Sequence, residues 1–104
     1  MLSFIETQLF TRLVQECLTD DEYQELQKLL MEQPEAGNVV RGSGGVRKLR
    51  WRAPGRGKRG GYRVIYYPKI EQGMIWMLTL YPMNVKDNIP AHILLAIRDE
   101  VENG

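Results

Sequence analysis

Apolar residues recur at helical spacing in the first third of the chain. They fall on every third or fourth position from Phe10 to Leu18 and again from Tyr23 to Leu30, which predicts two amphipathic helices. Thr19 and Glu22 match the Ser/Thr-x-x-Glu capping box at the start of the second helix. Pro34 predicts its end, because proline cannot continue a helix.

The rest of the chain alternates between strand-like runs and turn signals. Residues Leu2–Ile5 predict a short first strand, and longer strands are predicted over Val46–Arg52, Tyr62–Tyr67 and Met74–Tyr81. A last helix is predicted from a cap at Asn88, with Pro90 near its first turn.

The predicted order of elements is β-α-α-β-β-β-α, which describes an α+β fold. We expect a single domain over residues 1–104. In this domain two N-terminal helices and one C-terminal helix cover one face of an antiparallel sheet, and the other face is free.

Strand alternation assigns basic side chains to the free face. In the strand Val46–Arg52, alternation separates Lys48, Arg50 and Arg52 from Arg47, Leu49 and Trp51. In the strand Tyr62–Tyr67, Val64 and Tyr66 face the core, which leaves Arg63 and Tyr67 opposite. We therefore expect the free face to be cationic.

Charge is segregated along the chain, although the formal net charge is only +1. Between Ala36 and Ile70 there are ten basic residues and no acidic one, whereas both flanking segments are acidic. Such a positive field suits a polyanionic partner. Because guanidinium groups bind phosphate and the interleaved aromatic rings can stack on unpaired bases, the pattern predicts an RNA-binding surface.

The cysteine and histidine content limits the other functions. Cys17 and His92 are single residues of their kind, so they cannot form an internal disulfide or a zinc site. The N-terminus has no leader pattern, and no stretch approaches the ~18 apolar residues of a membrane span. We expect a cytoplasmic protein that needs no metal, cofactor or membrane.

Three linked sequence blocks resemble the HigB-like branch of the RelE superfamily of toxins. They are GSGGVRKLRW, GKRGGYRVIYY and MLTLYPMN, and the resemblance covers Asp21 to Tyr81 in order and spacing. It implies the β-α-α-β-β-β-α fold and a type II toxin that cuts messenger RNA in the ribosomal A site and so inhibits translation. The implied partners are the ribosome, mRNA and a cognate antitoxin, which we expect to be HigA-like with a helix-turn-helix domain.

The resemblance also assigns roles to individual residues. Arg63 matches the strand arginine that binds the scissile phosphate, and Lys48 and Arg50 match two cationic residues of the preceding strand. Lys48 would act as the base, because a lysine crowded by like charges gives up its proton more readily. Further candidates for RNA contact are Arg47, Arg52, Lys58, Arg59, Tyr67 and Lys86.

The sequence departs from this family after Tyr81. Many relatives have a lysine two positions further along, where this chain has Met83. Relatives also carry a catalytic residue near the last helix, whereas no tyrosine occurs between Asn84 and Pro90 here. Tyr81 is therefore the first candidate for the general acid, ahead of Lys86 and Tyr67.

Two other functions are compatible with this fold class. One is a ParE-like inhibitor of DNA gyrase, which would bind a protein instead of cutting RNA; the dense set of Lys and Arg argues against it. The other is a non-catalytic RNA- or ribosome-binding module, which the methionine at position 83 favours.

Overall fold

The computed structural model describes residues 2–54, 60–85 and 89–103. Its helices and strands are β1 Ser3–Glu6, α1 Gln8–Cys17, α2 Asp20–Glu32, β2 Asn38–Val39, β3 Arg47–Trp51, β4 Tyr62–Lys69, the 3-10 helix η1 Ile70–Gln72, β5 Met74–Pro82 and α3 Ala91–Asn103. The predicted α+β layout is confirmed, and β2 is an additional short strand that the apolar pattern did not predict.

Both N-terminal helices begin at threonine caps. Thr7 Oγ1 accepts a hydrogen bond from the Phe10 N–H at 3.0 Å at the start of α1. The predicted capping box of α2 is confirmed: Thr19 Oγ1 accepts from the Glu22 N–H at 3.1 Å, and the Glu22 carboxylate accepts from the Thr19 N–H at 2.9 Å. The caps satisfy N–H groups that have no partner within the helix.

The five strands form one sheet in the order β1-β5-β4-β3-β2. Four of them pair antiparallel, but β1 lies parallel to β5 at one edge, so the sheet is mixed where we expected an antiparallel one. Thr7 fixes this edge, because its N–H donates to Met77 O at 3.1 Å and its hydroxyl donates to Leu78 O at 2.8 Å.

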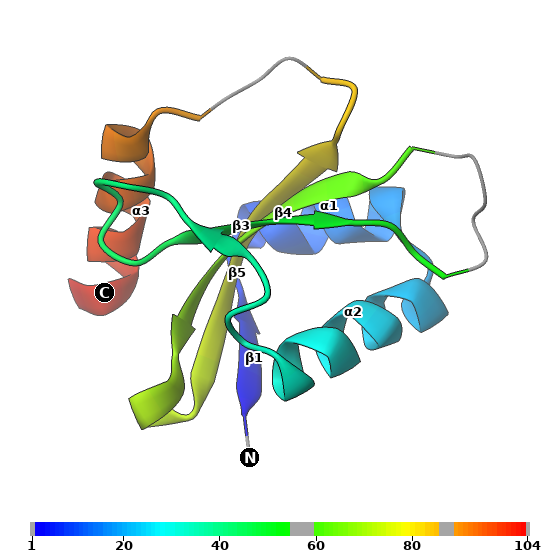
Figure 1. Ribbon diagram of the computed structural model, residues 1–104, viewed down its shortest axis with the longest axis horizontal. Helices are drawn as coiled ribbons and strands as arrows, with labels where there is room; N and C mark the ends of the chain where they lie inside the picture. Colours follow the sequence, from blue (N-terminus) through cyan, green and yellow to red (C-terminus); the bar gives the residue numbers. More distant parts are fainter. Residues whose placement is uncertain (1, 55–59, 86–88, 104) are drawn as a thin grey trace.

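The sheet carries a hydrophobic core on each face. The larger core joins α1 and α2 to the strands through buried residues that include Phe10, Leu26, Leu30, Val64 and Tyr66. The smaller core joins α3 to the opposite face through Val46, Ile65, Tyr67, Leu78 and Leu94. Figure 1 shows α3 at one end of the sheet, apart from α1 and α2. The expectation of one fully free face is therefore wrong where α3 packs, because the apolar stripe of this helix must also be buried.

Polar contacts fasten α3 to β4 and to the turn before β3. Glu102 accepts hydrogen bonds from the Tyr67 hydroxyl and, at 2.8 Å, from Lys69 Nζ. Arg98 Nε donates to Gly44 O at 3.1 Å, and its guanidinium lies 5.5 Å from the centre of the Tyr67 ring. The hydrogen bond from Lys69, followed by the bond from Tyr67, lowers the pKa of Glu102. The helix is thus fixed over one part of the sheet and leaves the rest of that face open.

Two further expectations concern the start of the last helix and the absence of a membrane span. The helix cap predicted at Asn88 lies outside the described residues, and α3 begins at Ala91, directly after Pro90. Within the described ranges, no helix is both long and apolar enough to cross a lipid bilayer.

Candidate nucleic-acid interface

The open part of the sheet carries a row of three polar side chains across its central strands. Arg50 of β3 lies directly opposite Arg63 of β4, and Arg63 lies directly opposite Tyr81 of β5. Side chains opposite each other on neighbouring strands share a face and are about 5 Å apart at Cβ. We call Arg50, Arg63 and Tyr81 the transverse row.

Lys48 adds a third cation beside the transverse row. It is two residues from Arg50 on β3 and therefore on the same face. Its cross-strand partners are Ile65 on β4 and Asn38 on β2. Lys48 and Arg63 are half-buried, whereas Arg50 is exposed. The placement of Lys48, Arg50 and Arg63 on one face, predicted from strand alternation, is confirmed.

A β-bulge puts Tyr81 on this face. Met77 packs in the larger core, so strict alternation would turn Tyr81, four residues later, towards α1 and α2. The register shifts between Ile65 and Tyr66 of β4, however, so that Thr79 pairs with Ile65 and Tyr81 pairs with Arg63. A bulge redirects the side chains that follow it, and Tyr81 packs beside the smaller core instead.

An open groove of about 730 Å³ begins at the transverse row and extends to the β2 edge. Among the residues that line it are Ala36, Asn38, Val40, Lys48, Arg50 and Arg63. In one corner of the site the Arg63 guanidinium donates a long hydrogen bond of 3.5 Å to Val85 O. The groove combines a cationic floor with an edge whose polar side chain is Asn38. The cationic floor is suited to a phosphate-bearing ligand.

The outer wall of the groove, residues Ala36 to Val40, is held from the other side of the sheet. The Tyr66 hydroxyl accepts a hydrogen bond from the Gly37 N–H at 2.8 Å and donates one to Pro34 O at 2.8 Å. Gly37 lies so close to β3 that an added Cβ would be 3.0 Å from Lys48 backbone atoms. Glycine therefore permits this close approach, and the approach brings β2 into register with β3.

Arg47 fastens the same wall and is not part of the open face. Its guanidinium donates to Gly37 O at 2.7 Å and to the Glu35 carboxylate at 3.2 Å. The expectation that Arg47 contacts RNA is wrong in this structure, because alternation turns it to the side of α2 and its hydrogen-bonding groups are occupied by the wall.

Tyr67 is also unavailable to a ligand. It lies on the predicted face, but it is only 8% exposed because α3 covers it. Its hydroxyl donates to Glu102. Burial, and then this hydrogen bond to a carboxylate, raises the pKa of Tyr67. The expectation of a stacking or proton-donating role for Tyr67 is therefore wrong, since the docking of α3 on this face was not predicted.

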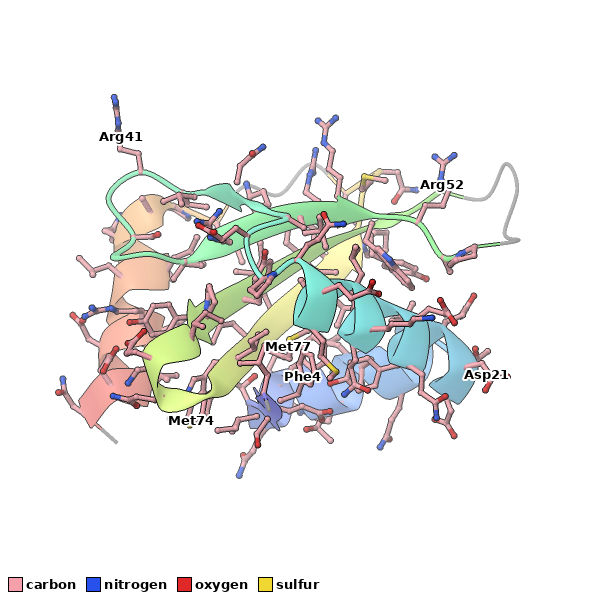
Figure 2. All side chains as sticks on the ribbon, turned by 60° about the horizontal axis from the view of Figure 1, so that its bottom comes forward. Phe4, Asp21, Arg41, Arg52, Met74 and Met77 are labelled. Carbon is pink, nitrogen blue, oxygen red and sulfur yellow. The ribbon has the colours of Figure 1, made fainter. Side chains whose placement is uncertain are left out.

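Two exposed arginines extend the positive surface beyond the groove. Figure 2 shows Arg41 and Arg52 pointing to the same side of the sheet, away from the layer of α1 and α2. Both are exposed. Arg52 thus lies where strand alternation predicted. Lys58, Arg59 and Lys86, the other candidates for RNA contact, lie outside the described residues.

Asn38 is the groove residue that the sequence analysis missed. A two-residue strand has no measurable alternation, so neither its existence nor its register with Lys48 is readable from local pattern. The available signal was Gly37, which precedes it and marks a close backbone approach.

Comparison with known proteins supports the fold. No family model matches the chain. The chain is similar to a solved structure of the Escherichia coli toxin RelE, a mutant with two arginines replaced by alanine in the free state. The two chains are 18% identical, the TM-score is 0.61, and the match covers 93% of this chain and 96% of that one. The chain therefore has the fold of a RelE toxin.

Proposed function

We propose that this protein is a RelE-like toxin that cleaves messenger RNA on the ribosome. The observation that carries the proposal is the transverse row together with Lys48: three cations and a tyrosine on one face of a sheet with the RelE fold. RNA cleavage by the neighbouring 2′-hydroxyl needs a proton acceptor, a proton donor and positive charge at the phosphate. These four side chains supply that set.

Each side chain has a distinct part in the proposed reaction. Lys48 takes the proton of the 2′-hydroxyl while the 2′-oxygen forms a bond to the adjacent phosphorus. Arg50 and Arg63 stabilise the negative charge that develops on the phosphoryl oxygens. The bond to the 5′-oxygen breaks, and Tyr81 donates a proton to that leaving oxygen. The products are a 2′,3′-cyclic phosphate and a free 5′-hydroxyl.

The proposed toxin branch, cellular compartment and antitoxin follow from the sequence resemblance. The three linked blocks favour the HigB-like branch, with the cytoplasm as the site of action and a HigA-like antitoxin as the neutralising partner. The basic residues of the open face, Lys48, Arg50, Arg52 and Arg63, offer an acidic antitoxin segment a complementary surface. Binding there would cover the transverse row and so block access to RNA.

The test is inducible expression with messenger-RNA ends mapped in the presence and absence of active translation. We expect new ends only during translation. Arg63→Ala should abolish cleavage and growth arrest, because removing a transition-state charge contact costs about 3 kcal/mol, or more than 100-fold in rate. Arg12→Ala is the matched control, since it removes the same charge from an exposed position on α1.

The alternatives predict different results in the same experiment. DNA damage dependent on gyrase, without new RNA ends, would select the ParE-like reading. Ribosome association without cleavage would select the non-catalytic module. That alternative is considered because Met83 stands where many similar sequences have a lysine. Full toxicity of a folded Arg63→Ala variant would contradict the assignment of the transverse row.

A further inference from the structure

We propose that Asn38 recognises a nucleobase next to the transverse row, with adenine as its preferred partner. This inference rests on the proposed function, because it requires RNA to lie over Lys48 and Arg63. It adds sequence preference to a site whose other described polar groups are suited mainly to phosphate.

The register of β2 brings Asn38 into the site. Asn38 lies directly opposite Lys48 across the β2–β3 pair, so both side chains are on the open face. Asn38 is exposed, and it lines the groove that also contains Arg50 and Arg63. An RNA strand with its phosphate at the arginines therefore has an adjacent base within reach of the Asn38 amide.

The chemistry of the amide determines the preferred base. Arginine and lysine contacts to phosphate position a nucleic acid but carry no sequence information. An asparagine offers a carbonyl acceptor beside an NH₂ donor, and this pair matches the N6 donor and N7 acceptor of adenine. Proteins read single-stranded RNA in this way, through hydrogen bonds to exposed base edges.

The position of Asn38 is fixed well enough for such recognition. Its neighbour Gly37 is tied to Tyr66 through the N–H and to Arg47 through the carbonyl, at 2.8 and 2.7 Å. Both bonds come from the face opposite the groove. Tyr66 and Arg47 are therefore positioning residues, which hold the amide in place without touching the ligand.

Binding of uncleavable RNA tests the inference directly. The probes are fluorescent hexamers of adenosine, cytidine or uridine with 2′-fluoro sugars, which lack the attacking hydroxyl, and anisotropy gives the affinity. We expect the adenosine hexamer to bind about 5- to 100-fold more tightly than the other two, the range for one bidentate base contact. Asn38→Ala should remove this difference while the cytidine and uridine hexamers bind as before.

Two further variants complete the design. Gln24→Ala removes an exposed amide from α2, in the layer on the other face of the sheet, and should keep the adenine preference. Asn38→Asp has the same shape but only acceptors, so its preference should move towards cytosine, whose N4 amino group donates. This isosteric variant also provides the test if Asn38→Ala does not fold.

The outcomes separate this inference from the proposed function. Equal binding of the three hexamers by the parent protein, or an adenine preference that survives in folded Asn38→Ala, would overturn the role of Asn38 even if mRNA is cleaved. An adenine preference that depends on Asn38, found in a protein that makes no RNA ends in cells, would retain the inference and reject the nuclease.

Discussion

At the residue scale, Tyr81 owes its position to one backbone irregularity. The register shift in the β4–β5 pair places its side chain opposite Arg63 instead of beneath α1. A phenol can donate a proton to an oxygen leaving a bound phosphate. The Tyr81 hydroxyl is buried in the free protein, so RNA binding must expose it for this role. Met83 stands where many similar sequences have a lysine. Tyr81 therefore has no obvious substitute as proton donor among the described residues.

This position leads to a kinetic prediction for Tyr81→Phe. The variant should cleave messenger RNA ~10²-fold more slowly in single-turnover reactions on programmed ribosomes, because general acid catalysis commonly contributes that much. Ribosome binding should be unchanged, since the ring and its packing remain. Cleavage at the parental rate would reject Tyr81 as the acid, and Met83→Lys, tested alongside, would reveal any gain from the missing lysine.

Residue placement within strands could be predicted because it depends on local alternation. The pattern of β3 correctly separated Lys48 and Arg50 from Arg47, and the pattern of β4 separated Arg63 from Tyr66. Tyr67 was put on the correct face, but its burial was not foreseen. That burial depends on α3, whose docking joins segments more than 30 residues apart, since Tyr67 and Glu102 are 35 positions apart.

At the scale of elements, α3 is held by a polar cluster as well as by its apolar stripe. Lys69 is only 6% exposed, and its ammonium is paired with Glu102. Removing one member of a buried ion pair leaves the other charge without a partner, which is destabilising. The stability of the contact between α3 and β4 should therefore depend on the charge of the Glu102 carboxylate.

We predict that this contact weakens in acid. The pKa of Glu102 is lowered in the folded protein, mainly by the hydrogen bond from Lys69. Its contribution to stability is therefore present above the unfolded pKa of about 4.3 and is lost as the pH falls through the lower folded value. Thermal unfolding of Glu102→Gln should show a lower Tm than the parent at pH 7, and the difference should shrink towards pH 3.

The control for this prediction is Glu100→Gln, an exposed substitution on the same helix. It should leave Tm and its pH dependence close to those of the parent. A difference between parent and Glu102→Gln that stays constant from pH 7 to pH 3 would mean that the carboxylate charge does not hold α3 in place.

Elements were predictable from sequence in proportion to their length and regularity. The helices α1 and α2 and the strands β3, β4 and β5 have clear periods, and the capping box marked the start of α2. The strand β2 has two residues and exists because Gly37 lets the chain approach β3. The parallel pairing of β1 depends on a partner about 70 residues away, so no local pattern could specify it.

At the scale of the whole molecule, the two sides of the sheet differ in charge. The helix α2 opens with Asp20, Asp21 and Glu22, whereas Lys48, Arg50 and Arg63 are on the open part of the opposite face. An electrostatic field that is negative at α2 and positive at the open face orients an approaching polyanion so that it meets the open face of the sheet. Affinity for RNA should then depend on counterion release.

The corresponding prediction concerns salt. If six or more phosphates are contacted, RNA affinity should fall about 10³-fold between 50 and 200 mM salt. Anisotropy titrations at several salt concentrations give the slope, and Arg63→Ala should reduce it by about one phosphate contact. Arg12→Ala, on the other side of the molecule, should keep the parental slope. A flat dependence would show that phosphates contribute little to binding.

The pairing of β1 with β5 also orders events during synthesis. The Thr7 hydroxyl, next to the first strand, bonds to Leu78, which is made 71 residues later. A nascent chain therefore cannot complete the sheet until β5 has left the ribosome, because domains fold as units once their long-range partners are available. Tyr81 is near the end of that same strand. The nascent protein thus lacks an assembled transverse row while its own message is read through β5. Under the proposed function, it could not cleave RNA on the ribosome that makes it before that point.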